Sequence, residues 1–168
     1  MADDQGISIV SYEDRFADDF ARLNREWLDR FGLYEEADGK QLYAPRQAII
    51  DTGGEIFVAM KAGRVVGTCA LVRMSLWMFE IAKLSVDKDV RGAGLSRRLT
   101  QYAIDRARQL HATTVALVSS TKLTNALRLY ESMGFVHKPL PASQPYATAD
   151  VYMELELSED DDSGVKRI

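Results

Sequence analysis

The sequence predicts an α/β protein with one mixed β-sheet of six or seven strands and about four helices. Three β-prone runs lie close together between residues 55 and 86, which is typical of an antiparallel meander. A strand, a helix and another strand then follow between residues 77 and 119. That order predicts a parallel pair joined by a right-handed crossover.

The N-terminal third predicts a short strand and two helices. Residues 7–10 are β-prone, and apolar residues then recur every three or four positions, which predicts an amphipathic helix ending near Gly32. These residues are Phe16, Phe20, Leu23, Trp27 and Phe31. A second helix is expected from Pro45, which suits the first helical position, to Gly53. The acidic residues Glu35, Glu36 and Asp38 fall between the two expected helices.

The meander comprises residues 55–61, 64–74 and 77–86. Side chains alternate between the two faces of a strand. In the third run, strict alternation places Glu80 on a mainly apolar face together with Met78, Ala82, Leu84 and Val86.

The second half of the chain predicts two more helices and three more strands. Apolar spacing predicts a helix over 94–110, and the β-branched run 113–119 predicts a buried strand. Another helix is expected over 123–133, with Gly134 ending it. Residues 135–140 and 150–157 predict the last two strands.

Composition predicts one domain over residues 5–157, because 168 residues that are 46% hydrophobic can bury a substantial core. Residues 158–168 form an acidic tail that is expected to be solvated and mobile. The net charge of the chain is −4, but the charges within residues 5–157 sum to zero. We therefore expect no nucleic-acid partner.

No run approaches the length of a membrane span, and the N-terminus lacks the features of a signal peptide, so we expect a cytoplasmic protein without a membrane partner. Cys69 is the one cysteine, and there are two histidines. These counts exclude an internal disulfide and show no zinc cluster, so no metal is expected. The sequence is compatible with a homodimer.

A glycine-containing turn is the clearest functional signal. Residues 86–99 read as a strand end, a turn with glycines at 92 and 94, and a helix start. Glycine permits positive φ or close approach of the backbone, and the first turn of a helix leaves amides unpaired beside its positive dipole end. Arg91 adds a donor suited to phosphate oxygens. This turn by itself indicates either a phosphate site or an ordinary connection between a strand and a helix.

Two motifs together resemble the GCN5-related N-acetyltransferase family. Arg91, Gly94 and Ser96 match the family's (Arg/Gln)-x-x-Gly-x-(Gly/Ala) pattern, with serine at its last position. Leu129-Tyr130-Glu131 followed by Gly134-Phe135 matches a later motif. The resemblance covers most of the chain, and its order of elements agrees with the family's acyl-CoA N-acyltransferase fold.

The resemblance implies acetyl-CoA as the cosubstrate. Its pyrophosphate would bind the backbone amides of the loop, formed by Arg91, Gly92, Ala93, Gly94, Leu95 and Ser96. Its pantetheine arm would pair with the backbone of Leu84, Ser85 and Val86, where the sheet splays open. Many members carry a coenzyme-contacting asparagine where this chain has Leu123, and the nearby Asn125 is a candidate substitute or an ordinary helix-start residue.

The resemblance also implies attack of a neutral amine on a thioester, with an N-acetylated product. Tyr130 matches the family's proton donor to the departing thiolate, and a buried core tyrosine is the alternative. Glu80 is the candidate general base, because an apolar setting raises the pKa of a carboxyl group. A salt bridge to Lys83, or a solvent-exposed strand face, is the alternative for Glu80.

The acceptor is expected to be an amine on a small molecule, amino acid or protein. It would bind between the first two helices and the last hairpin. The candidate residues are Glu35, Glu36, Asp38, Tyr43, Tyr146 and Asp150. A solvated acidic loop is the alternative for the acidic residues among them.

A non-catalytic acyl-CoA sensor or interaction module of the same fold stays open, because fold does not determine function. A dinucleotide-dependent oxidoreductase does not fit the glycine turn. Arg97 stands where a third glycine is needed, position 114 is threonine rather than an acid, and a meander precedes the turn.

Overall fold

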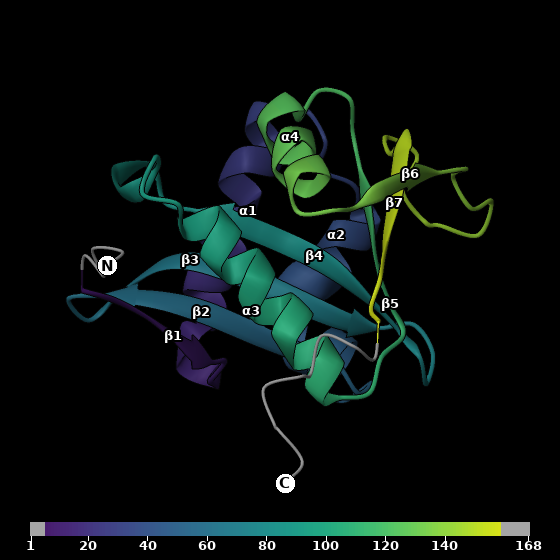
Figure 1. Ribbon diagram of the computed structural model, residues 1–168. Coiled ribbons are helices and arrows are strands. Elements are labelled where there is room, and N and C mark those ends of the chain that lie inside the picture. Colours follow the sequence, from purple (N-terminus) through teal and green to yellow (C-terminus); the bar gives the residue numbers. More distant parts are fainter. Residues whose placement is uncertain (1–5, 159–168) are drawn as a thin grey trace, which may run out of the picture.

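The computed structural model describes residues 6–158. It confirms the predicted class: seven strands form one mixed sheet in the order β1-β2-β3-β4-β5-β7-β6, with helices on both faces (Figure 1). The predicted acidic tail lies outside the described residues except for Ser158. No helix within residues 6–158 is both long and apolar enough to cross a membrane.

The strands are β1 (Ile7–Ser11), β2 (Glu55–Lys61), β3 (Arg64–Arg73), β4 (Met78–Val86), β5 (Thr114–Ser119), β6 (Val136–Lys138) and β7 (Val151–Glu156). The α-helices are α1 (Ala17–Arg30), α2 (Glu36–Tyr43), α3 (Leu95–Gln109) and α4 (Thr124–Ser132). Three short helical turns, η1 (Asp14–Phe16), η2 (Arg46–Ile50) and η3 (Lys88–Val90), complete the order.

β2, β3 and β4 form the predicted antiparallel meander, and β4 pairs with β5 in parallel. β1 adds to the outer edge of the meander by antiparallel pairing with β2. The parallel pairing joins Met78 to Thr114 and ends where Glu80 meets Ala116. Both strands continue beyond this point, β4 to Val86 and β5 to Ser119. The sheet is therefore splayed at the ends of β4 and β5, as the family resemblance implies.

Two apolar layers hold the fold together. α3 crosses one face of the sheet while α1 and α2 lie behind the other (Figure 1). The first layer includes Leu99 and Ala103 of α3, and Tyr130 of α4. The second includes Phe20 and Leu23 of α1. Burying large apolar side chains contributes about 1.5–3 kcal/mol each, so both layers are needed to fix the sheet between them.

The second helix differs from the prediction. α2 covers Glu36–Tyr43, where a loop was expected, and the expected helix from Pro45 is only a five-residue π-helical turn, η2. The two fully buried positions of α2 are Leu42 and an aspartate, Asp38. Because one inward position is charged, the helix lacks the apolar stripe by which sequence reasoning detects helices.

The faces of β4 also differ from the prediction. Phe79 and Ile81 pack in the α3 layer, and so do Leu84 and Val86, whereas Ala82 packs in the α1 layer. The register shifts at this point, and Lys83 has a φ of 52°. This bulge inserts a residue and reverses the alternation. Glu80 therefore shares its face with Ala82 but not with Leu84 and Val86.

Candidate functional site

Two side-chain hydrogen bonds stabilise the bulge in β4, one from β3 and one from β4 itself to α1. The Thr68 hydroxyl in β3 donates to the Lys83 carbonyl at 2.8 Å, and the Ser85 hydroxyl donates to the Leu23 carbonyl in α1 at 2.9 Å. A positive φ is unfavourable for lysine, so these contacts are needed to hold it. The bulge turns the end of β4 away from β5 and aims the Lys83 side chain toward α2.

A cavity of about 820 Å³ lies at the splayed end of the sheet. Its walls come from the ends of β4 and β5, the glycine turn, the start of α3, and α4. They include every predicted cofactor-binding residue except Ala93, namely Leu84, Ser85, Val86, Arg91, Gly92, Gly94, Leu95, Ser96 and Asn125. The topology therefore brings residues more than forty positions apart in sequence to one opening.

The glycine turn has the backbone that the sequence predicts. Gly92 and Gly94 have φ of 84° and 73°, and Gly94 is the residue before the first turn of α3. A side-chain carbon built on either glycine meets no atom within 4 Å. Glycine is required here for its conformation, and the space above the turn is open to a ligand.

Arg91 is held by the protein rather than free. Its Nε donates to the Val86 carbonyl at 3.4 Å, and its Nη2 lies 3.5 Å from Glu26. Both side chains of this ion pair are about 40% exposed. Such a pair is weak, so Glu26 does not prevent Arg91 from turning to an anion in the cavity.

Tyr130 lies on α4 with its ring in the core and lines the larger cavity. It is 7% exposed and meets the Phe135 ring edge-on at 5.7 Å. Burial raises its pKa above the ordinary value of 10.0. A packing role in the core and a functional role are therefore compatible for Tyr130, because its ring packs against Phe135 while the residue also lines the larger cavity.

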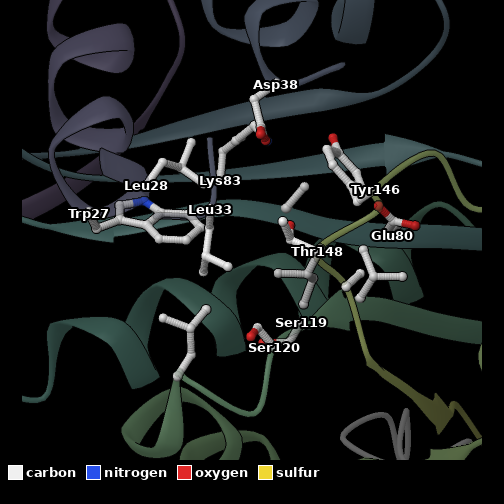
Figure 2. A pocket seen from close by; sticks show the side chains of 15 residues that line it. Trp27, Leu28, Leu33, Asp38, Glu80, Lys83, Ser119, Ser120, Tyr146 and Thr148 are labelled. Carbon is white, nitrogen blue, oxygen red and sulfur yellow. The ribbon is translucent and has the colours of Figure 1, made fainter. Parts of the chain in front are cut away.

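A smaller cavity of about 90 Å³ adjoins the larger one. The two share wall residues from α1, β4 and β5, including Trp27, Ala82, Lys83, Val118 and Ser119. Figure 2 shows Trp27 and Glu80 on opposite sides of the smaller cavity. The Trp27 indole is oriented by α1 itself, because its Nε1 donates to Asn24 at 3.1 Å.

Glu80 projects into the smaller cavity beside Tyr146 (Figure 2). Burial raises its pKa from 4.5 to about 7, and the nearby positive charge of Lys83 offsets part of that rise. The alternative for Glu80, a salt bridge to Lys83, does not form, because Lys83 pairs with Asp38. A carboxyl group that titrates near neutrality can accept a proton at physiological pH.

The ion pair between Lys83 and Asp38 is the main site feature that sequence reasoning missed. The Lys83 ammonium and the Asp38 carboxylate are 2.5 Å apart, and their side chains are only 5% and 3% exposed. The other Asp38 oxygen accepts from the Glu35 amide at 2.8 Å, which caps α2. No spacing in the sequence links positions 38 and 83, so tertiary packing alone reveals the pair.

The remaining acceptor candidates separate into two groups. Tyr146 lines the smaller cavity, whereas Glu36 and Tyr43 line neither cavity. Tyr43 is 60% exposed and accepts a hydrogen bond from Arg25 at 3.0 Å. Asp150 binds the Thr121 amide and hydroxyl, both at 2.8 Å, and these bonds lower its pKa.

Glu35 binds the segment between β6 and β7. Its carboxylate accepts from the Ala147 amide at 2.8 Å and from the amide and hydroxyl of Thr148 at 3.0 and 2.6 Å. Burial alone would raise the pKa of Glu35, but the hydrogen bonds from Thr148 and Ala147 outweigh it and lower the pKa. Both carboxylate oxygens of Glu35 are therefore occupied by hydrogen bonds to residues 147 and 148. We call these hydrogen bonds the Glu35 clasp, because they fix the segment that carries Tyr146.

Glu35→Ala is therefore expected to loosen residues 146–149. Charge-assisted hydrogen bonds contribute about 1.5–3 kcal/mol each, so amide exchange at Ala147 and Thr148 should accelerate by about tenfold or more. Hydrogen exchange read by NMR measures this directly. Glu36→Ala removes the next carboxylate along α2, which lines neither cavity. Equal exchange in both variants would contradict the clasp.

The fold and the two adjoining cavities define the class of protein. Its members have a mixed sheet that is splayed at one end, with a glycine turn at the opening. The family model of the acetyltransferase (GNAT) family matches residues 17–135. That range covers more than half of the chain and includes the glycine turn, Glu80 and Tyr130. The chain belongs to this family, as the resemblance implies.

Curated relatives agree with the family assignment. N-acetyltransferase 8 of Mus musculus is 36% identical over 91 residues, which are 49% of this chain and 39% of that protein. N-alpha-acetyltransferase 30 of Saccharomyces cerevisiae is 36% identical over 56 residues, which are 33% of this chain and 32% of that protein. The matches thus span well under half the length of these relatives.

Solved structures share the fold at low sequence identity. A GNAT acetyltransferase of Staphylococcus aureus Mu50 superposes with a TM-score of 0.83 at 21% identity, covering 90% of this chain and 99% of that one. An acetyltransferase from Salmonella typhimurium, described with its cofactor acetyl-CoA, has a TM-score of 0.69 at 19% identity, with 91% and 95% covered. Spermidine N-acetyltransferase of Vibrio cholerae, in complex with CoA and spermine, has a TM-score of 0.68 at 21% identity, with 90% and 95% covered.

Proposed function

We propose that this protein transfers an acetyl group from acetyl-CoA to a primary amine, by direct attack within a ternary complex. One observation carries the proposal: the two cavities share a wall, and they hold Tyr130 in one and Glu80 in the other. A thioester at the junction would have a proton donor on the coenzyme side and a proton acceptor on the amine side.

The larger cavity suits the coenzyme. The amides at the start of α3 and the positive φ of Gly92 and Gly94 form an anion-binding turn, and Arg91 borders it. Beyond Glu80, β4 has no pairing with β5. Along residues 84–86, the edge of β4 that faces β5 can therefore pair with an extended amide-containing arm. The Salmonella and Vibrio relatives described with acetyl-CoA or CoA support this assignment at the level of the family.

The reaction requires a neutral amine. Glu80 removes a proton from the ammonium, directly or through a water molecule, and the amine nitrogen then attacks the carbonyl carbon of the thioester. As that bond forms, negative charge develops on the carbonyl oxygen, and a backbone amide near Val86 is the candidate donor to it. The carbon–sulfur bond then breaks and releases the thiolate.

Tyr130 donates a hydrogen bond, and finally its proton, to the thiolate. The nitrogen still carries an extra proton after its attack, and it passes this proton through water to the Tyr130 phenolate. Glu80 releases the first proton to solvent, so a neutral amide and a free thiol are formed and both side chains are restored. Burial raises the pKa of the phenol, which keeps it protonated. The same surroundings disfavour charge on a thiolate beside it, so the pKa of the coenzyme thiol is expected to rise as well. The two groups thus remain matched for proton transfer.

Release of the coenzyme thiol with a panel of primary amines tests the function, with the acetylated product identified by mass spectrometry. We expect turnover with at least one amine and micromolar binding of acetyl-CoA by calorimetry. Tight coenzyme binding without turnover of any amine would instead identify an acyl-CoA-binding module.

Tyr130→Phe should lower kcat by about 20-fold and leave the affinity for acetyl-CoA nearly unchanged, since the hydroxyl acts on the leaving group only. The effect is moderate because a thiolate is a stable leaving group. Steady-state kinetics and calorimetry measure the two quantities. Tyr102→Phe is the matched control: its ring also packs edge-on in the core, against Phe57, but it lines neither cavity. An unchanged kcat in Tyr130→Phe would remove the residue from the mechanism.

A further inference from the structure

The smaller cavity contains a specific arrangement of charge. Its walls are mostly apolar, from Leu28, Leu33, Ala82, Val118 and Leu123, with the aromatic rings of Trp27 and Tyr146. Its charged residues are Asp38, Glu80 and Lys83. The chemistry of the acceptor must suit this arrangement.

The positive charge of Lys83 is already neutralised. Among residues 6–158, Lys83 is the one cation that lines the smaller cavity, and its ammonium pairs with Asp38 where both side chains are at most 5% exposed. The ammonium also lies 5.2 Å from the centre of the Tyr146 ring, which further stabilises it. Separating such a pair would leave a buried carboxylate without a partner, at a large cost.

Asp38 cannot move away to release Lys83. It is 2% exposed, and its second oxygen is bound to the Glu35 amide at the start of α2. Glu35 is in turn fixed by Ala147 and Thr148. One oxygen of the aspartate is therefore fixed by the helix cap and the other pairs with Lys83, so a ligand carboxylate would have to compete with a carboxylate that is already held in place.

Glu80 is the charge that remains. With Asp38 and Lys83 cancelling each other, the cavity is neutral when Glu80 is protonated and negative when it is ionised. An ammonium group is attracted to such a cavity. A carboxylate next to the reacting nitrogen would be buried near Glu80 without a free cation, which is strongly unfavourable.

We propose that the acceptor is a primary amine with an apolar substituent and no carboxylate on the carbon next to its nitrogen, so that α-amino acids are excluded. This inference rests on the proposed acetyl transfer. It assigns Asp38 as a specificity-determining residue, because Asp38 prevents Lys83 from receiving a substrate carboxylate.

Three acceptors of similar shape test the proposal with the full-length protein and acetyl-CoA: 3-methylbutylamine, leucinamide and leucine. The amide matches the amino acid in bulk but lacks its negative charge. We expect kcat/KM for the amine and the amide to exceed that for leucine by at least about 100-fold. Rejection of leucinamide as strongly as leucine would show that bulk decides, and efficient use of leucine would show that a carboxylate is accepted. Either result overturns the inference.

Two variants connect the preference to the ion pair. Asp38→Asn releases Lys83 and should reduce the ratio of kcat/KM for leucinamide to that for leucine by about tenfold. The double variant Asp38→Asn with Lys83→Met removes both charges and should keep the original preference. Thermal unfolding establishes that each variant folds, and calorimetry with the CoA-bound protein gives a second measure of acceptor binding. An equal preference in all three proteins would contradict the role of Asp38.

Failure of the two proposals is distinguishable. If only amines with a carboxylate are acetylated, the proposed function stands and this inference is wrong. If neither a broad amine panel nor these three acceptors release the coenzyme thiol while acetyl-CoA binds, the proposed function fails and this inference fails with it.

Discussion

Glu80→Gln is expected to lower kcat by about 1000-fold, within the range that general-base catalysis supplies. Glutamine keeps the shape of the side chain and lines the cavity equally well, but it cannot accept the proton of the acceptor ammonium. Steady-state kinetics at saturating acetyl-CoA measure the loss. Glu36→Gln is the matched control, because that carboxylate lies on α2 and lines neither cavity.

The pH profile separates a base from a residue that only positions substrate. The pKa of Glu80 is raised from 4.5 to about 7. The ionised form is the base, so kcat/KM should increase as the pH rises through about 7, and then level off unless the amine titrates. In Glu80→Gln this limb should disappear. If Glu80→Gln kept the same rise of kcat/KM near pH 7, the rise would belong to another titrating group.

The same substitution is expected to stabilise the protein at high pH. Because burial raises the pKa of Glu80, the folded state binds more protons than the unfolded state between pH 4.5 and about 7, and the wild type loses stability as the pH rises through this window. Glu80 is partly exposed, so we expect a gain of about 1–2 kcal/mol for Glu80→Gln at pH 8, which vanishes near pH 4. Urea unfolding at the two pH values measures it, and equal stability of the two proteins at pH 8 would contradict the raised pKa of Glu80.

Gly94→Val should weaken acetyl-CoA binding by about 1000-fold or more, since it removes the close approach of phosphates to the turn and strains its backbone. Gly94 has a φ of 73°, which valine tolerates poorly. Calorimetry with acetyl-CoA gives the affinity.

Gly63→Val provides an unusually close control for strain. Gly63 lies in the turn between β2 and β3, has a φ of 76°, and like Gly94 would place a new side-chain carbon in open space. The backbone cost of valine should therefore be similar at the two positions, but Gly63 does not line the coenzyme cavity. Normal affinity in Gly94→Val, or an equal loss in both variants, would refute the phosphate site.

Local patterns were sufficient for much of the fold. The meander, the parallel pair and α3 follow from alternation, tight turns and helical spacing, and these signals depend on neighbours within a few residues. For Gly92 and Gly94 the sequence left open either a positive φ or a close approach of the backbone, and the structure shows a positive φ at both. The splayed end of β4 and β5 required the family resemblance as well.

The amino-acid sequence was thus enough to predict the strands of the meander, the glycine turn and the two motifs that indicate the family, because each of these is encoded by a short contiguous segment. It was not enough for the acceptor side of the site. α2 escaped detection because Asp38 replaces an apolar residue on its buried face, and the bulge at Lys83 reversed the predicted faces of β4. Both differences from the prediction involve the same ion pair. The buried carboxylate of Asp38 and the ammonium of Lys83 neutralise each other, so the helix can bury an aspartate and the strand can bury a lysine that has a positive φ. Contacts between distant positions decided which charges face the amine, and no local pattern records such contacts.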